Sequence, residues 1–246
     1  MRSALVSLRR KLIAHTNQRL AVWGSLGSVV TFTFDDFPRT ALTAGGDILR
    51  AAGVHGTYYA AMGMMNSTNH LGEQFRRDDL DSLLRDGHEL ANHTFDHTSC
   101  QKSSVKQFTE DVRKGELAIR EVTGDAECGN FAYPYGRVTI RVKGEVGPRV
   151  RSSRGIWEGI NGPTVDLNLM RANSLYAGIE QSQRVRNLIL ENERRQGWLI
   201  FYTHDVQKSP SPYGCTPEML QFAVSAAARS GARILTVAEV MSNLAA

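Results

Sequence analysis

Residues 28–36 have the sequence SVVTFTFDD, a β-branched and aromatic run that ends in two acidic residues. Such a run is typical of a buried strand. Similar runs recur along the chain, and the expected strands are residues 28–34, 56–62, 88–92, 130–133, 151–157, 198–203 and 232–237. Helices are expected between them, over residues 42–52, 73–86, 103–122, 180–196 and 216–229. This alternation predicts a parallel sheet with helical crossovers, either closed into a barrel or open and doubly wound.

The clearest helix spans residues 103–122. Its apolar residues share one face at helical spacing, and they are Val105, Phe108, Val112, Ile119 and Val122. Ser103 or Ser104 is suited to cap the start, and Gly124 lies just beyond the end, where glycine commonly terminates a helix.

Size and composition favour one globular domain. The 246 residues are 41% hydrophobic and 22% charged, which argues against a disordered or coiled-coil chain. The formal charge is +4, and five basic residues precede the first acidic residue, Asp35: Arg2, Arg9, Arg10, Lys11 and Arg19. The rest of the chain is therefore near neutral and has no recognisable nucleic-acid-reading motif, so we expect no nucleic acid as partner.

The basic start of the chain predicts a helical segment over residues 1–28, packed on a domain of residues 29–246. Contact of residues 2–19 with an anionic membrane surface is the alternative. The sequence has no signal-peptide core and no run of about 18 apolar residues. Three cysteines, Cys100, Cys128 and Cys215, form no CxxC pair. We therefore expect a cytoplasmic protein with reduced thiols.

Several expected strands run directly into residues that bind metals or transfer protons. These residues are Asp35 and Asp36 after residues 28–34, His93 after residues 88–92, and His204 after residues 198–203. Because the C-terminal ends of parallel strands meet at one rim, we expect these side chains to surround one site.

His93 and His97 lie four residues apart, a spacing that lets two imidazoles reach one cation. Alone, such a pair is more often a surface feature, and Asp35 and Asp36 alone would suit a cap of the next helix or turn. One carboxylate and two histidines together form a ligand set of catalytic zinc, which keeps a coordination position open. His204 would be either a core histidine or a general acid at the rim.

Four motifs resemble, in order and spacing, those of the polysaccharide deacetylases of carbohydrate esterase family 4, also called the NodB homology domain. They are TFDD at 33–36, HTFDH at 93–97, YPYG at 133–136 and YTHD at 202–205. The resemblance extends from residue 29 to about residue 240. It implies a distorted (β/α) barrel of seven or eight strands.

The resemblance also implies roles for the motif residues. One divalent metal ion, usually zinc with cobalt, nickel or manganese as alternatives, would be bound by Asp36, His93 and His97. Asp35 would act as general base and His204 as general acid. The backbone N–H of Tyr135, after Pro134, would bind the oxyanion, while Thr94 would brace the histidine loop.

Two family features are missing. The family usually has an arginine two residues before the proline of the third motif, where it pairs with the catalytic aspartate, but this chain has Ala132. Arg171 or Arg154 would substitute for it. The fourth motif, an acidic residue with a tryptophan, is absent as such; Asp166 and Trp157 are the candidates, with Asp166 expected to orient His204.

We therefore expect a metal-dependent enzyme that removes an N-acetyl, or alternatively an N-formyl, group from an amino sugar of a glycan or glycan precursor. Amide hydrolysis needs a nucleophile, an acceptor for charge on the carbonyl oxygen and a proton for the leaving amine, and the residues above supply all three. A cytoplasmic location favours a nucleotide- or lipid-linked sugar. The alternatives are an amidase or esterase with a non-sugar substrate and a non-catalytic sugar-binding protein.

Overall fold

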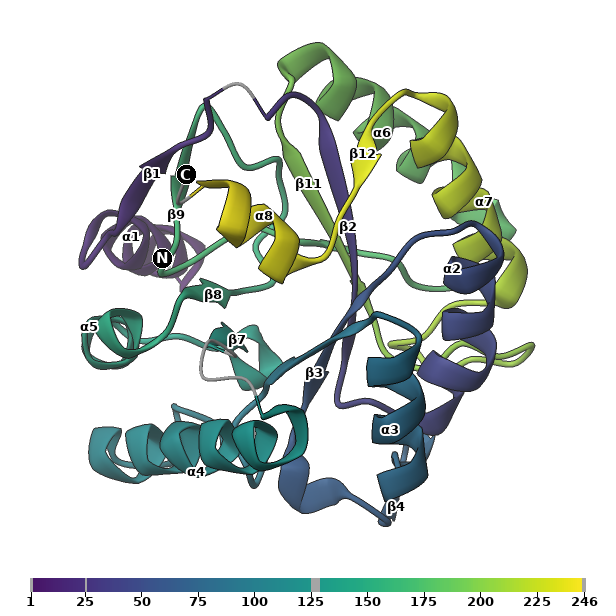
Figure 1. Cartoon of the computed structure of the whole chain (residues 1–246). Coiled ribbons are helices and arrows are strands. Elements are labelled where there is room, and N and C mark those ends of the chain that lie inside the picture. The colour runs from purple at the N-terminus through teal and green to yellow at the C-terminus, as the bar shows by residue number, and fades with distance from the viewer. Residues whose placement is uncertain (1, 25, 125–128, 245–246) are drawn as a thin grey trace.

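The computed structural model describes residues 2–24, 26–124 and 129–244, with side chains from residue 8 onward (Figure 1). Its helices are α1 (Arg2–His15), α2 (Asp47–Ala51), α3 (Arg77–Arg85), α4 (Val105–Thr123), α5 (Ile140–Val146), α6 (Ser182–Arg195), α7 (Pro217–Arg229) and α8 (Val237–Leu244). Its strands are β1 (Leu20–Val22), β2 (Val29–Asp35), β3 (Thr57–Ala60), β4 (Thr68–Asn69), β5 (Gly72–Glu73), β6 (Glu89–Asn92), β7 (Asn130–Ala132), β8 (Ser152–Arg154), β9 (Thr164–Asp166), β10 (Asn173–Ser174), β11 (Trp198–Thr203) and β12 (Arg233–Ile234). Short 3₁₀ or π-helical turns cover Ala41–Gly46, Met62–Met64, Pro134–Gly136, Gly147–Arg149 and Ile179–Gln181.

The main sheet is parallel, with the strand order β10-β11-β2-β3-β6-β7-β8, and β12 pairs with the start of β2. The two ends of this path meet beside β8. There the N–H of Met170 donates to the carbonyl of Ser153, and the N–H of Gly155 donates to the carbonyl of Met170, at 2.8 and 3.0 Å. The expected distorted barrel is therefore confirmed, and the open, doubly wound alternative is wrong.

β2 lies at the centre of the sheet, and all seven of its residues are buried. Phe32 and Phe34 point toward the helices, where their rings stack on Phe201 and Tyr58 with centroids 5.8 and 4.6 Å apart. The alternate residues, which end in Asp35, face the interior of the barrel. Burial on both faces explains why the strand consists of β-branched and aromatic residues up to Asp35.

One end of the barrel is closed by α8, which crosses the opening that faces the viewer in Figure 1. Its first turn is bound to the starts of two strands. The N–H of Val237 donates to Thr57 Oγ1 at 3.0 Å, and the N–H of Ala238 donates to Glu89 Oε2 at 2.8 Å. The opposite end, where the parallel strands finish, is thus the end available for a site.

Most of the expected elements are confirmed with shifted boundaries. α4 agrees well, since Ser104 caps its start and Gly124 follows its end with a left-handed φ of 64°. The helix expected from residue 73 begins at Arg77, because Asp79 accepts the N–H of Arg76 at 2.8 Å and so fixes the first turn. Seven of the described helices and strands were not expected: α5, α8 and the short strands β1, β4, β5, β9 and β10.

The N-terminal segment contains α1 and β1, and it contacts the rest of the chain at both. β1 pairs antiparallel with β9, and Lys143 Nζ of α5 donates to the carbonyls of Ile13 and Ala14 at 3.0 and 3.3 Å. The boundary expected between residues 28 and 29 stays a prediction, because these contacts do not define a domain division.

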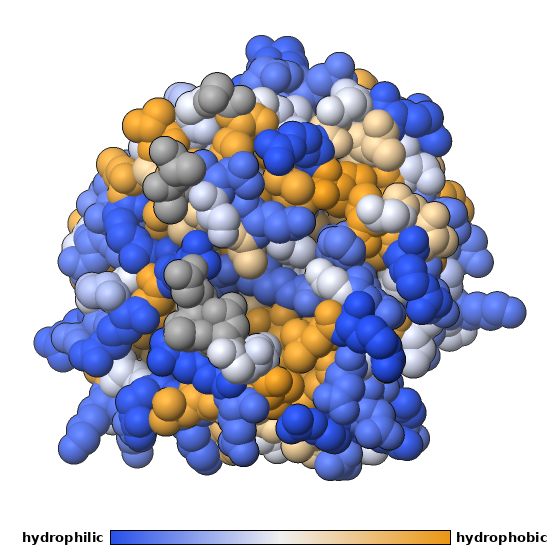
Figure 2. All heavy atoms as spheres, in the orientation of Figure 1, coloured by the Kyte–Doolittle hydropathy of each residue, from blue (hydrophilic) through white to orange (hydrophobic). Residues whose placement is uncertain are grey.

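The chain surface is largely hydrophilic on the face seen in Figure 1, and hydrophobic residues show between the polar ones (Figure 2). Among the described helices, none combines the length and apolar character needed to cross a membrane. Cys100 and Cys215 are free and buried, whereas Cys128 lies outside the described residues.

Candidate metal centre and catalytic cavity

The C-terminal ends of the central strands open into a cavity of about 480 Å³. Six of the residues expected from the sequence line it: Asp35, Asp36, His93, His97, Tyr135 and His204. They come from four separate strand ends, because β11, β2, β3, β6 and β7 are parallel neighbours. The expectation that these side chains share one rim is therefore met.

Asp36, His93 and His97 form a compact cluster, in which one ligand atom from each lies within 4.8 Å of the others. Asp36 Oδ1 is 3.4 Å from His93 Nε2 and 3.0 Å from His97 Nε2. Asp36 and His97 both have positive φ, 63° and 53°, so the chain turns sharply at each and directs the two side chains to the same point.

The donor atoms of this cluster fit a divalent cation. Asp36 Oδ1 is buried and has no hydrogen-bond donor. His93 Nδ1 is 2.8 Å from the Ala132 carbonyl, so this nitrogen carries the proton and Nε2 presents a lone pair toward Asp36 in the neutral ring. In that tautomer the lone pair of His93 Nε2 faces the unpartnered Asp36 Oδ1, and His97 Nε2 lies beside them, an arrangement that a bound cation would satisfy.

The electrostatics favour an ionised Asp36. Burial alone would raise the pKa of this carboxyl, but hydrogen bonds and positive charge from His93 and His97, which those rings supply when they are protonated and no cation is bound, more than offset that effect and hold the pKa well below its usual value. Asp36 is therefore ionised at neutral pH, in the form that could bind a cation.

The histidine loop is braced from two sides. Thr94 Oγ1 accepts the N–H of Thr98 at 3.1 Å, across the loop that carries both histidines. Gly115 of α4 lies directly under the loop, where a Cβ would approach Asn92 Oδ1 to 2.4 Å and the carbonyl carbon of Thr94 to 2.8 Å. Only glycine allows α4 to approach the loop this closely.

Asp35 is paired with Arg154, which ends β8. Arg154 Nη2 donates to Asp35 Oδ1, and Nη1 donates to the Gly155 carbonyl at 3.0 Å. The fully buried guanidinium also lies over the rings of Tyr59 and Tyr202, at 4.8 and 5.3 Å from their centroids. Burial alone would lower the pKa of Arg154, but attraction to Asp35 outweighs it and the pKa is raised.

Arg154 therefore supplies the positive charge beside Asp35 that the family motif would supply from position 132, where this chain has Ala132. The other candidate, Arg171, was wrong for this pairing, because its Nη1 donates to the Glu158 carbonyl at 2.9 Å and it lines a neighbouring cavity instead.

His204 lies at the rim, half-buried, with Nδ1 3.1 Å from the Tyr213 carbonyl and its ring beside those of Tyr176 and Tyr213. Because a carbonyl only accepts, Nδ1 carries a proton and Nε2 is the nitrogen that can exchange one with a bound molecule. The expected partner Asp166 was wrong: its carboxylate binds Lys143 Nζ at 2.7 Å and the N–H of Arg19 at 3.1 Å.

Tyr135 follows Pro134 in a tight turn and has a φ of 59°. Its ring packs on the His97 ring with centroids 4.5 Å apart, and its side chain stays largely exposed. The turn is close-packed, since a Cβ on Gly136 would lie 2.1 Å from Ile156. The backbone of Tyr135 is thus held beside His97 of the candidate metal cluster.

Sequence reasoning missed several residues that line the cavity. It also missed Tyr59, which packs against the Arg154 guanidinium behind the cavity; Tyr59 is the register partner of Asp35 on β3, so strand alternation alone would have placed it beside that residue. His70 lines the cavity with its ring 6.1 Å from that of Tyr213, although its position in a loop gave no sequence signal. Tyr176 and Tyr213 also lie in connecting segments.

Comparison with known proteins gives a consistent family. Residues 25–146, about half of the chain, match the family model described as Polysaccharide deacetylase. The peptidoglycan-N-acetylglucosamine deacetylase PgdA of Listeria monocytogenes is 27% identical over 135 residues, which cover 54% of this chain and 25% of that protein. A chitooligosaccharide deacetylase of Azorhizobium caulinodans is 26% identical over 116 residues, which cover 47% of this chain and 51% of that one. The chain thus spans a quarter to a half of these relatives' length.

Solved structures share the fold over nearly the whole chain. Bacillus subtilis PdaA, a family 4 carbohydrate esterase, superposes with a TM-score of 0.58 at 13% identity and covers 95% of this chain and 88% of its own. A family 4 acetyl xylan esterase from Clostridium thermocellum, solved with a cobalt ion, has a TM-score of 0.58 at 18% identity, with 87% and 91% covered. At these identities the likeness concerns the fold.

Proposed function

Because this chain belongs to the polysaccharide deacetylase family, we propose that it is a metal-dependent hydrolase that removes an N-acetyl group from an amino sugar. One observation carries the proposal. The cluster of Asp36, His93 and His97 shares a single cavity with Asp35 and with His204.

Asp36, His93 and His97 would hold a divalent ion, with zinc as our first candidate because one oxygen and two nitrogen ligands suit it. When bound, such an ion supplies the Lewis acidity that polarises an amide carbonyl and acidifies a coordinated water. His93 is oriented for this by its bond to Ala132, and Thr94 holds the loop that presents His97.

Asp35 would accept the proton of the attacking water. Its pairing with Arg154 keeps the carboxylate in one orientation toward the cavity and stabilises its negative charge. A placed general base contributes about 10²- to 10⁴-fold to the rate. The backbone N–H of Tyr135 would donate to the oxygen of the tetrahedral intermediate, a contact worth about 2.7 to 4 kcal/mol.

His204 would give a proton from Nε2 to the leaving amine. The Tyr213 carbonyl fixes the ring through Nδ1, so both nitrogens donate when the imidazole is protonated. The three requirements of amide hydrolysis would then be met by residues from four strand ends around one cavity.

The second candidate is an esterase of the same architecture, which the likeness to an acetyl xylan esterase favours. A non-catalytic sugar-binding role loses support, because Arg154 supplies the cation that Ala132 lacks. N-formyl sugars and non-sugar amides are further substrates to compare. We also propose a cytoplasmic location, which fractionation of cells carrying the tagged protein would test.

The test is acetate release by the purified protein, before and after chelation and reloading with zinc or cobalt. We expect metal-dependent release from N-acetylated chitooligosaccharides and little from O-acetylated xylan. Faster release from the ester would favour the esterase, and metal-independent release from any substrate would exclude the proposed centre.

A further inference from the structure

A second cavity, of about 730 Å³, lies next to the catalytic one. The two share Tyr135, Gly136, Arg137 and Ile156 in their walls. A molecule seated in the catalytic cavity can therefore extend past Tyr135 into this neighbouring space, which we call the arginine cleft. Its other walls come from α1 and from residues 156–158.

The arginine cleft is strongly cationic. Four arginines line it: Arg9, Arg10, Arg137 and Arg171. Glu158 is the acidic residue among those lining it, and its carboxylate binds Arg184 Nη2 at 2.9 Å. Uncompensated guanidinium groups repel one another across a confined space, so the arrangement favours a bound anion.

Three of the guanidinium groups are held in place by contacts with other residues of the protein. Arg171 Nη1 donates to the Glu158 carbonyl at 2.9 Å, Arg137 Nη1 donates to Gln101 Oε1, and Arg10 lies over the Trp157 ring at 6.0 Å. These contacts use a fraction of the five N–H donors of each arginine. The remaining donors suit the planar, bidentate recognition of phosphate or carboxylate oxygens.

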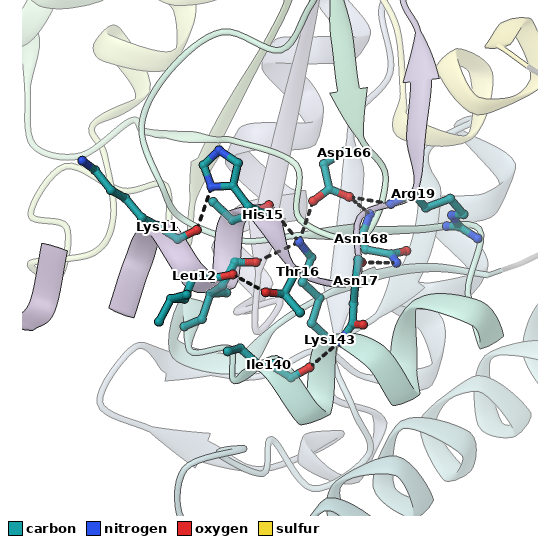
Figure 3. Close-up of polar contacts among 12 residues, drawn as sticks. Lys11, Leu12, His15, Thr16, Asn17, Arg19, Ile140, Lys143, Asp166 and Asn168 are labelled. Atoms are coloured by element: carbon teal, nitrogen blue, oxygen red, sulfur yellow. Dashed lines mark hydrogen bonds and ion pairs between the residues drawn. The ribbon is translucent and has the colours of Figure 1, made fainter. Parts of the chain in front are cut away.

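α1 forms one wall of the arginine cleft through Arg9, Arg10 and Ile13. The end of this helix is fixed by Lys143, whose ammonium donates to the carbonyls of Ile13 and Ala14 and pairs with Asp166 Oδ2. Figure 3 shows Lys143 and Asp166 facing each other beside the end of α1. Arg9 and Arg10 are thereby placed in the wall of the arginine cleft, next to the catalytic cavity.

We propose that the arginine cleft binds an anionic group, a phosphate ester or a carboxylate, that belongs to the same molecule as the acetylated sugar in the catalytic cavity. The part of this inference that concerns the acetylated sugar rests on the proposed function. It predicts that acidic or phosphate-linked amino sugars bind more tightly than neutral chitin-like chains, which lack the anionic group.

The test uses the double variant Arg9→Gln/Arg171→Gln, which removes two charges and keeps polar side chains of similar reach. The matched control is Arg194→Gln/Arg195→Gln on α6. These two arginines are exposed, bind Glu191 and do not line the arginine cleft. Inorganic pyrophosphate binding is measured by calorimetry. Steady-state kinetics compare UDP-N-acetylglucosamine, an oligosaccharide that contains N-acetylmuramic acid, and neutral tetra-N-acetylchitotetraose.

We expect the cleft variant to lose about 10-fold or more of its pyrophosphate affinity, and to raise KM for one of the two anionic substrates by a similar factor with little change in kcat. KM for the neutral tetrasaccharide should stay the same, as should every value in the control variant. The anionic substrate that responds identifies phosphate or carboxylate as the ligand.

An equal rise of KM for neutral and anionic substrates, or pyrophosphate affinity unchanged in the cleft variant, would overturn the inference. The binding arm does not depend on turnover. If no substrate is deacetylated but pyrophosphate binding still requires Arg9 and Arg171, the anion site stands and the proposed hydrolase fails.

Discussion

Arg154 and Asp35 lie 119 residues apart in the sequence and form a buried ion pair across the interior of the barrel. The pair joins the end of β8 to the end of β2, with the Arg154 side chain held between the rings of Tyr59 and Tyr202. It explains how the site can contain Ala132 where an arginine is usual, because the cation comes from the next strand of the sheet in the same interior position.

The first prediction concerns Arg154→Gln. Removal of the guanidinium leaves Asp35 buried without a countercharge, so we expect kcat to fall by about 10² or more and stability to fall by about 3 kcal/mol. Acetate release and denaturant unfolding measure the two effects. Arg171→Gln is the control and should retain kcat on a neutral substrate. Equal losses in both variants would show that the pairing of Arg154 with Asp35 is not what supports catalysis.

The second prediction separates the two adjacent aspartates. Asp35→Asn should lower turnover by about 10²- to 10⁴-fold while zinc still binds, because only Asp36 faces the histidine pair. Asp36→Asn should lose zinc as well as activity. Metal content after gel filtration, together with acetate release, measures both. Zinc loss in Asp35→Asn would make that residue a ligand.

The sequence predicted the site well where residues that can bind a metal or transfer a proton directly follow a strand. Asp35, Asp36, His93 and His204 each follow a strand that the apolar pattern identifies, and parallel pairing then brings them together. Arg154 could be named only as one of two candidates, because a lone arginine at the end of the short strand Ser152–Arg154 has no pattern that pairs it with Asp35.

The remaining features depend on tertiary contacts that leave little local signal. Asp166 lies in a segment without regular periodicity, and its partner Lys143 comes from a helix that was not expected. The strand β10 has only two residues, too few for an alternating pattern. His70 reaches the cavity from a loop, so its role follows from the fold of residues 64–75 rather than from its neighbours in the sequence.

The third prediction tests the contact between α4 and the histidine loop. Gly115→Ala should reduce metal affinity by about 10- to 100-fold, because the new Cβ would displace Thr94 and so misplace His93 and His97. Alanine favours an isolated helix, so a loss cannot come from helix propensity. Competition with a zinc indicator measures the affinity.

Gly144→Ala is the matched control for this variant. Its Cβ would also be crowded, by Asn17 Nδ2 at 2.6 Å, but in α5 and away from the histidine loop. Metal affinity should be preserved there. A similar loss in both variants would point to general destabilisation instead of ligand positioning.

The fourth prediction concerns His88 and pH. This side chain is buried and accepts the N–H of Gly56 at 3.0 Å, and burial lowers its pKa from 6.5 to about 4. The unfolded chain therefore binds a proton before the folded one does. We expect His88 to reduce stability progressively as pH falls from about 6.5 to 4, by up to about 3 kcal/mol.

Denaturant unfolding at several pH values measures this effect. His88→Gln keeps an acceptor for Gly56 but does not titrate, so its stability should fall less steeply over this range. The exposed His15→Gln serves as the control and should follow the parent protein. Parallel curves for all three proteins would assign the acid sensitivity to other groups.

The fifth prediction concerns Lys143, which is fully buried and binds Asp166 together with the last carbonyls of α1. Lys143→Met leaves the Asp166 carboxylate without its cation and frees the end of α1, so we expect a loss of about 3 kcal/mol of stability. Thermal unfolding measures this, and proteolysis within residues 8–19 should become faster. Lys106→Met, at an exposed position of α4, is the control and should keep the stability of the parent protein.

Restoring charge balance provides the decisive comparison. Lys143→Met/Asp166→Asn removes both charges, so it should recover part of the stability lost in the single variant, as expected when an unpaired buried charge is the main cost. The end of α1 would still lack its ammonium donor, so Arg9 and Arg10 should remain poorly placed. Recovered stability with a persistently weak affinity for pyrophosphate would separate the role of Lys143 in positioning α1 from its role in folding, whereas full recovery of both would show that α1 needs no such contact.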